Sequence, residues 1–264
     1  MTPSPLRRLM SRRPPRARRG RSPALSSHDV VSARIHPAAD GVRIGHLSDL
    51  HVRTGVKPRR LHAAVEMLNG LRPDLVVLTG DYVCMSPRPL PELTAALKAL
   101  QAPAYAVLGN HDHWSGAGAV RAALERAGVD VLQNEHRVVR AAGSTLHLVG
   151  VDDSVTGHDD PERAFDGVPE GATLVALSHD PKSADHLHAY RPALILSGHT
   201  HGGQVFIRRL TPFMARRAGI KYLSGFFEVN GAVLYVNRGL GASLPIRFRA
   251  PCEVGHLTLR SRAA

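Results

Sequence analysis

The chain has 264 residues, of which 43% are apolar, 21% charged and 5% aromatic, and its formal net charge is +12. That length can bury a large core, and two cysteines are too few for a disulfide-stapled scaffold or a thiolate metal cluster. No apolar stretch reaches the ~18 residues of a membrane-spanning helix, so an integral membrane protein is not expected.

The positive charge is concentrated at the start of the chain. Residues 1–40 contain nine arginines against Asp29 and Asp40, which assigns +7 to this segment and leaves +5 for the remainder. Many prolines and few large apolar side chains predict a disordered basic tail over residues 1–39, followed by one folded domain over residues 40–264. The tail lacks the apolar region of a signal peptide, so we expect a cytoplasmic protein.

A tail of this charge is suited to an anionic membrane surface, and we interpret it as a peripheral contact with the inner membrane. A solvated tail without a partner and a misassigned start codon are the alternatives. Nucleic acid is disfavoured as a partner, because the rest of the chain carries only +5 and has few aromatic side chains for base stacking. Nothing in the sequence specifies the oligomeric state.

Short apolar runs alternate with helical patterns in the first half of the predicted domain. In chain order, the predicted elements are a strand over 42–47, a helix over 58–71, a strand over 75–78, a helix over 90–100, a strand over 104–108 and a helix over 117–127. Strands that alternate with helices favour βαβ units and a mainly parallel sheet.

The second half is richer in strands. They are predicted over 129–132, 137–140, 145–151, 173–177, 194–196, 232–236 and 254–259. A helix is predicted from Pro181, with Asp180 as its N-cap. We therefore expect an α/β fold in which two packed mixed β-sheets are flanked by helices.

Side chains that can bind metals follow five of the predicted strands. They occur as Asp49-x-His51, Gly80-Asp81, Asn110-His111-Asp112, His179 and His199-x-His201. A single histidine at a strand end is usually a structural residue, but ligands in α/β proteins bind where strands end, and five such motifs are hard to explain as caps. Oxygen and imidazole ligands without thiolate favour Mn²⁺, Fe, Zn²⁺ or Co²⁺.

The ordered motifs D-x-H, G-D, G-N-H-D, H and G-H-x-H, spread over residues 43–205, resemble the calcineurin-like metallophosphoesterase superfamily. The resemblance implies a four-layer sandwich with a binuclear metal centre that binds two divalent transition-metal ions, Mn²⁺ being favoured. It implies that one ion is held by Asp49, His51, Asp81 and His201. It implies that the second is held by Asp81, Asn110, His179 and His199, with Asp81 bridging.

The same resemblance implies a phosphoesterase. His111 resembles the catalytic histidine beside the leaving group, and Asp112 the acid that orients it. Two divalent ions about 3.5–4 Å apart can clamp the attacking and phosphoryl oxygens, so a metal-bridging hydroxide is expected to attack phosphorus in line. His111 would then protonate the leaving oxygen or stabilise its charge.

Later segments narrow the resemblance to a bacterial branch. Residues 199–204, residues 235–241 and Pro251-Cys252-Glu253 resemble membrane-associated phosphodiesterases and UDP-diacylglucosamine pyrophosphatases. This favours cleavage of a phosphodiester or pyrophosphate bond in a lipid-linked or nucleotide-sugar substrate. The alternatives are a phosphomonoesterase or nuclease that uses the same site, and a non-catalytic metal-binding scaffold. The scaffold is disfavoured because all seven ligands and His111 are present.

Overall fold

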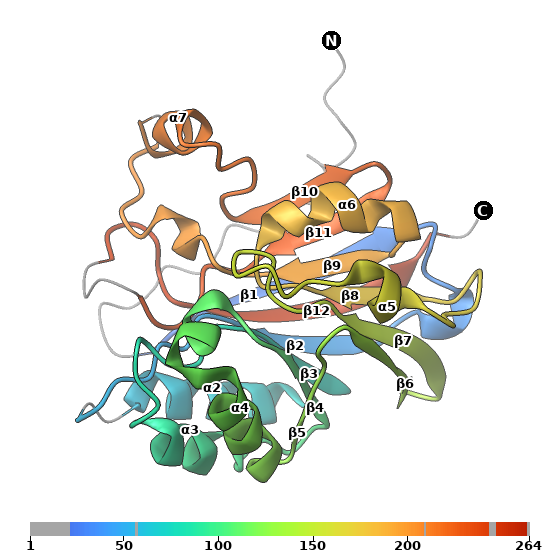
Figure 1. Ribbon diagram of the computed structural model, residues 1–264. Coiled ribbons are helices and arrows are strands. Elements are labelled where there is room, and N and C mark those ends of the chain that lie inside the picture. Colours follow the sequence, from blue (N-terminus) through green and yellow to red (C-terminus); the bar gives the residue numbers. More distant parts are fainter. Residues whose placement is uncertain (1–21, 56–57, 209, 243–246, 263–264) are drawn as a thin grey trace.

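Two β-sheets packed face to face form the centre of the molecule in the computed structural model (Figure 1). The structure describes residues 22–55, 58–208, 210–242 and 247–262. A buried apolar layer separates the sheets and contains, for example, Ile44 and Val77 of one sheet and Leu148 and Leu196 of the other.

The first sheet has the strand order β1-β12-β2-β3-β4-β5. Its strands are β1 (Ala24–Ser32), β2 (Arg43–Leu47), β3 (Leu75–Thr79), β4 (Ala104–Val107), β5 (Val129–Val131) and β12 (Glu253–Ser261). Only the β12–β2 pair is antiparallel among these strands. Every residue of β3 is buried, as expected for an apolar strand of a parallel sheet covered on both faces.

The second sheet has the strand order β10-β11-β9-β8-β7-β6. Its strands are β6 (Glu135–Ala141), β7 (Ser144–Gly150), β8 (Leu174–Leu177), β9 (Leu194–Ser197), β10 (Gly225–Val229) and β11 (Ala232–Val236). Antiparallel pairs lie at both edges, and the pairs between them are parallel. Both sheets are therefore mixed.

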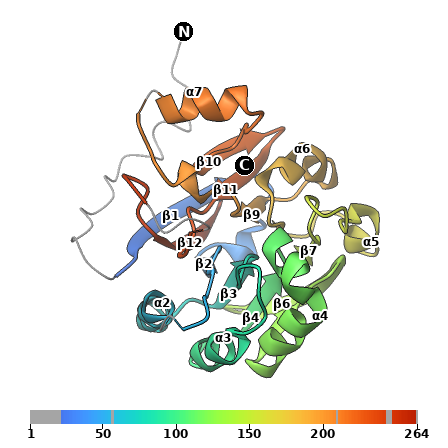
Figure 2. The ribbon, with the colours of Figure 1, turned by 60° about the vertical axis from the view of Figure 1, so that its left-hand side comes forward.

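Helices cover the outer faces of the two sheets (Figure 2). The first sheet is covered by α2 (Arg59–Leu71), α3 (Leu90–Leu97) and α4 (Asn110–Arg126). The second is covered by α5 (Pro161–Phe165), α6 (Ala184–Leu187) and the 3₁₀ turns Pro181–Ser183 and His188–Tyr190, whereas α7 (Leu210–Arg217) stands apart from the sheets (Figure 1). These four layers confirm the predicted fold. Among the described residues, none of the helices has the length and apolar character that a bilayer crossing requires.

The helix predicted over 117–127 begins earlier, at Asn110, because a glycine joins two helical segments. Gly116 has φ 104° and ψ 84°, which bends α4 after its first turns. The amide of Gly109 donates to Asp112 (3.0 Å) and anchors the start of the helix beside β4. This first segment carries three of the predicted site residues.

The prediction of a disordered tail over residues 1–39 is wrong for its described part. Ala24–Ser32 forms β1, which pairs in parallel with β12 along its whole length, and a 3₁₀ turn follows at Pro37–Ala39. Eight of the nine arginines precede Ser22, so composition averaged over the segment concealed a strand whose partner lies at the other end of the chain. Residues 1–21 lie outside the described residues.

Candidate metal centre

The five predicted motifs lie together at the carboxyl ends of β2, β3, β4, β8 and β9. Backbone hydrogen bonds join neighbouring ends within each sheet: the Asp49 amide donates to Gly80 (3.0 Å), and the Gly198 amide donates to His179 (3.1 Å). The two sheets meet where the His199 amide donates to Asp49 Oδ2 (3.0 Å). Segments separated by about half of the chain thus form one site.

One group of side chains has its ligand atoms within 4.8 Å of one another and consists of Asp49, His51, Asp81 and His201. His51 Nε2 lies 3.6 Å from Asp81 Oδ2 and 3.2 Å from His201 Nε2. His201 Nε2 lies 3.5 Å from Asp49 Oδ1. All four residues are buried.

A second group shares Asp81 with the first and adds His179 and His199. Asp81 Oδ2 lies 3.3 Å from His179 Nε2, and His179 Nε2 lies 3.1 Å from His199 Nδ1. One carboxylate oxygen therefore faces a histidine of each group, which is the geometry that a ligand shared by two ions requires.

Asn110, the seventh predicted ligand, lies at the first position of α4 beside Asp81. It is only 2% exposed, and its Oδ1 accepts no hydrogen bond from the described residues. The next amide, that of His111, donates to Asp81 Oδ1 (2.9 Å) and fixes this turn against the shared carboxylate. A buried amide oxygen without a donor is costly to leave unsatisfied and can serve as a metal ligand.

The residues fit two divalent ions. Two imidazole nitrogens about 3 Å apart repel each other through their lone pairs unless a proton or cation lies between them, and this contact occurs once in each group, at His51–His201 and at His179–His199. Two carboxylates, one amide oxygen and four imidazoles without thiolate suit Mn²⁺, Fe, Zn²⁺ or Co²⁺.

The backbone is strained at most of the predicted ligands. Positive φ angles, which side chains other than glycine rarely adopt, occur at Asp49 (50°), His51 (43°), Asp81 (58°), His199 (68°) and His201 (52°). Each such conformation costs about 1–3 kcal/mol and persists where the surrounding structure imposes it. Five of the thirteen described non-glycine residues with positive φ are thus predicted ligands, and strained backbone is often found at functional sites.

A chain of hydrogen bonds behind the site orients Asp49. The ring of His46 contacts Thr79 Oγ1 (2.9 Å), Thr79 Oγ1 donates to Ser48 Oγ (2.9 Å), and Ser48 Oγ donates to Asp49 Oδ2 (2.6 Å). Sequence reasoning missed Ser48 and Thr79. The sequence did contain a signal for them. A small hydroxyl residue stands where the preceding strand ends in both cases, Ser48 before Asp49 and Thr79 before Asp81.

Burial and charge set the protonation of the site. Burial lowers the pKa of His51 to about 4, so its ring is neutral and able to coordinate. Burial also opposes charge on His179, but the nearby Asp81 carboxylate outweighs it and raises the pKa of His179 well above its ordinary value. Burial raises the pKa of Asp81, and His179 reverses that effect and lowers it far below the ordinary range. Each of the two groups therefore favours the charged form of the other.

Asp112 does not orient His111, contrary to the expectation from the resemblance. Its carboxylate accepts hydrogen bonds from the amides of Asp81 (2.8 Å), Tyr82 (2.8 Å) and Gly109 (3.0 Å), whereas His111 Nδ1 has no hydrogen-bond partner among the described residues. Burial and then the charge of Asp81 raise the pKa of Asp112 to about 7. Asp112 thus acts on the loop that presents Asp81.

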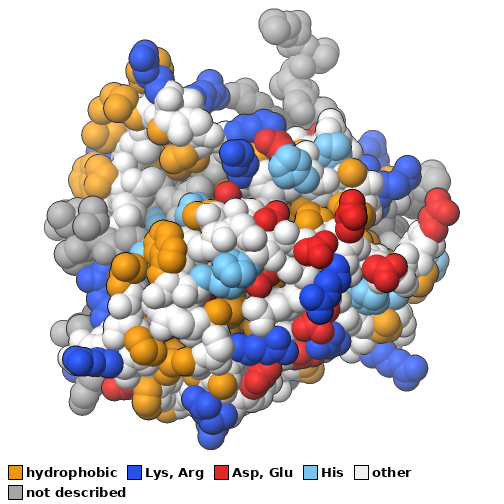
Figure 3. All heavy atoms as spheres, in the orientation of Figure 1, with side chains coloured by type: hydrophobic (Ala, Val, Ile, Leu, Met, Phe, Trp, Pro, Cys, Tyr) orange, Lys and Arg blue, Asp and Glu red, His pale blue; other side chains and the backbone are white. Residues whose placement is uncertain are grey.

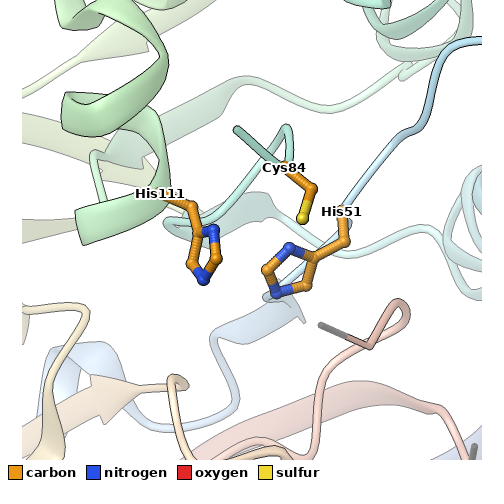
Figure 4. Close-up of side chains that lie close together, drawn as sticks. All are labelled: His51, Cys84 and His111. Carbon is orange, nitrogen blue, oxygen red and sulfur yellow. The ribbon is translucent and has the colours of Figure 1, made fainter. Parts of the chain in front are cut away.

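His111 lies at the edge of the metal groups, between His51 and Trp114. Its ring makes edge-on contacts with His51 (4.9 Å between centroids) and with Trp114 (5.0 Å), and Trp114 is 54% exposed. Figure 4 shows Cys84 beside the same two histidines, with ligand atoms of all three residues within 4.8 Å of one another. Cys84 is half-buried and lies next to the site.

The known proteins that this chain is similar to include several phosphoesterases. The family model described as calcineurin-like phosphoesterase matches residues 42–203. The uncharacterized metallophosphoesterase YkuE of Bacillus subtilis is 31% identical over 89% of this chain and 85% of that protein. UDP-2,3-diacylglucosamine pyrophosphatase LpxG of Chlamydia trachomatis is 28% identical over 81% of this chain and 82% of its own length. Phosphodiesterase YaeI of Escherichia coli is 29% identical over 82% of each chain.

Proposed function

Because this chain belongs to the calcineurin-like phosphoesterase family and is a phosphoric ester hydrolase, we propose that it cleaves a phosphodiester or pyrophosphate bond. Two relatives support this choice of bond, since one is named a pyrophosphatase and the other a phosphodiesterase. The proposed substrate class is a lipid-linked or nucleotide-sugar phosphoester, in keeping with the UDP-diacylglucosamine named for the former relative.

The shared position of Asp81 supports a two-ion site. Its Oδ2 atom faces His51 at 3.6 Å and His179 at 3.3 Å. We assign one ion to Asp49, His51, Asp81 and His201. We assign the other to Asp81, Asn110, His179 and His199. Two divalent ions, of which we favour Mn²⁺, supply Lewis acidity toward a phosphoryl oxygen and activate the nucleophile.

His111 is proposed to act on the leaving group. Its ring stands beside His51 yet belongs to neither ligand group, so it can hold a proton next to the substrate. The ring of Trp114 contacts His111 edge-on, with 5.0 Å between the ring centroids, and is itself 54% exposed. Asp112 is proposed to position Asp81. Its carboxylate accepts hydrogen bonds from the backbone amides of Asp81 and Tyr82, and these bonds fix the turn that carries Asp81.

A substrate panel tests the proposed bond. Mn²⁺-loaded protein is given a nitrophenyl phosphodiester, a glycerophosphodiester, a nucleotide-diphosphate lipid and a nitrophenyl monoester, and Asp81→Asn is the control for loss of the site. We expect turnover of the diester or pyrophosphate substrates and none by the control. Selective cleavage of the monoester would assign a phosphomonoesterase instead. Two bound ions without turnover of any substrate would assign a scaffold.

A further inference from the structure

Exposed apolar side chains gather on one protruding segment, residues 204–208 and 210–224 together with Phe248 and Arg249, which we call the α7 lobe. The large apolar residues on it are 40–56% exposed and comprise Val205, Ile207, Leu210, Phe213, Met214, Ile220 and Phe248. Elsewhere in the described residues such side chains are fewer, namely Met85, Trp114, Val138 and Val155. A contiguous exposed apolar patch on a globular domain marks an interaction surface.

The helix at the centre of the lobe contributes almost nothing to the core. Only Ala215 is buried among the residues of α7, and Figure 1 shows the helix apart from both sheets. The lobe is held by its own contacts: Thr211 Oγ1 donates to Val205 (2.8 Å), and the Phe206 amide donates to Phe248 (2.7 Å). Its apolar side chains are therefore presented outward on a folded support.

The charge of the lobe is positive throughout. No aspartate or glutamate occurs in the sequence between Asp185 and Glu228. Arg208, Arg216, Arg217 and Arg249 are exposed there. The guanidinium of Arg217 lies 5.9 Å from the Phe213 ring centre, and that of Arg249 lies 5.2 Å from the Phe248 ring centre. Figure 3 shows apolar and basic side chains side by side over α7, at the upper left.

The lobe is continuous with the metal centre. The 3₁₀ turn His201–Gly203 leads directly into it, and at its other end the Thr200 hydroxyl donates to the carbonyl of Leu223. Both ends are thus fixed beside the loop that carries His199 and His201.

We propose that the α7 lobe docks the protein on an anionic lipid bilayer. Phe213 and Met214 enter the boundary between head groups and acyl chains, while Arg216 and Arg217 contact the anionic head groups. A second copy of the chain is disfavoured as the partner that covers this surface. Two lobes that carry basic residues and no acidic ones repel each other. Attachment through the lobe does not depend on which bond the protein cleaves.

Co-sedimentation of the full-length protein with vesicles tests the proposal. We expect binding to phosphatidylcholine vesicles that contain phosphatidylglycerol, and much weaker binding to phosphatidylcholine alone. The double variant Phe213→Ser, Met214→Ser should raise the dissociation constant about tenfold or more. The double variant Arg216→Gln, Arg217→Gln should raise it about fivefold for each charge removed. Val138→Ser, which alters a 60% exposed apolar residue on β6, is the matched control and should bind as the wild type does.

Two further measurements separate the alternatives. Trp114 is the only tryptophan, so Phe213→Trp in a Trp114→Phe background places one reporter on the lobe, and brominated acyl chains should quench its emission. Wild-type affinity of the Phe213, Met214 variant would overturn the proposal in favour of attachment through the arginines before Ser22. A dimer in lipid-free solution that the same variant abolishes would overturn it in favour of a second copy.

Discussion

The Nδ1 atom of His179 lies 2.7 Å from the carbonyl oxygen of Thr79. Because a carbonyl only accepts hydrogen bonds, Nδ1 carries a proton, and Nε2 is the atom that faces Asp81. A backbone group at the end of β3 therefore decides which nitrogen of a residue after β8 is available to a metal ion.

Metal affinity should fall as the pH falls. Burial opposes charge on His179, but Asp81 raises its pKa well above the ordinary value, so an ion must displace a proton from His179. Below the raised pKa we expect about a tenfold loss of Mn²⁺ affinity per pH unit. Calorimetric titrations at about pH 6 and about pH 8 measure this loss and the protons released. Affinity that is independent of pH over that range would contradict the assignment of His179 as a ligand.

His111→Ala should separate catalysis from metal binding. His111 touches His51 but belongs to neither ligand group with Asp81, so the variant should retain both ions and lose about 10²–10⁴-fold in kcat. Metal content by elemental analysis and turnover of a nitrophenyl phosphodiester are the two measurements. Normal turnover at full metal content would show that His111 does not act on the leaving group.

Asp112→Asn should destabilise the protein and weaken metal binding together. The buried carboxylate accepts from several backbone amides, whereas an asparagine offers one oxygen and turns its NH₂ group toward amide donors. We expect a loss of about 2–4 kcal/mol in the free energy of unfolding, measured by denaturant titration. The matched control is Asp166→Asn at an exposed acid. An equally small effect of both substitutions would be inconsistent with a positioning role for Asp112.

The pair formed by His113 and Asp152 should stabilise the fold within a limited pH range. Their side chains are 2.9 Å apart. Burial lowers the pKa of His113, but the hydrogen bond and charge of Asp152 outweigh it, so the net shift is upward. Burial raises the pKa of Asp152, and its hydrogen bonds from His113 and Gln133 bring it below the ordinary value.

The stabilisation by this pair is therefore present below the ordinary pKa of histidine, about 6.5, and is lost as the pH rises through the raised value for His113. At the acidic end it is lost as the pH falls through the lowered pKa of Asp152. We expect His113→Gln to reduce the free energy of unfolding by about 1–2 kcal/mol near pH 6 and by less near pH 9. Unfolding curves of this variant and of the exposed control His62→Gln test it. If the loss of unfolding free energy caused by His113→Gln grew as the pH rises, the expected direction of the pH dependence would be wrong.

Alkylation of Cys84 should inactivate the enzyme. Its sulfur lies within 4.8 Å of ligand atoms of His51 and His111, so an added maleimide occupies the space beside the proposed leaving-group histidine. Treatment of the wild type with N-ethylmaleimide should reduce turnover at least about tenfold. Cys84→Ser should resist the reagent, and Cys252→Ser should remain sensitive. Resistance conferred by Cys252→Ser instead would place the sensitive thiol elsewhere.

The order of strands, helices and polar motifs could be predicted from the sequence alone. The helical period of Leu61, Val65 and Leu68 and the apolar run of β3 depend on neighbouring residues, and α2 and β3 lie where those patterns predict them. Each of the five metal-binding motifs likewise follows a strand that the sequence predicts. In chain order these strands are β2, β3, β4, β8 and β9. Local periodicity reports such features because it arises from backbone geometry within one element.

Only the tertiary structure decided how distant segments meet. β1 forms because β12, at the far end of the chain, provides its hydrogen-bond partners. Asp112 lies next to His111 in sequence yet bonds to the turn after β3, and Asp81 faces both His51 and His179 because the sheets bring three strand ends together. The exposure of Phe213 on α7 has the same origin. The pairing of β1 with β12, the contacts of Asp112 and the exposure of an apolar residue such as Phe213 depend on contacts across the chain, which the local pattern of residues does not encode.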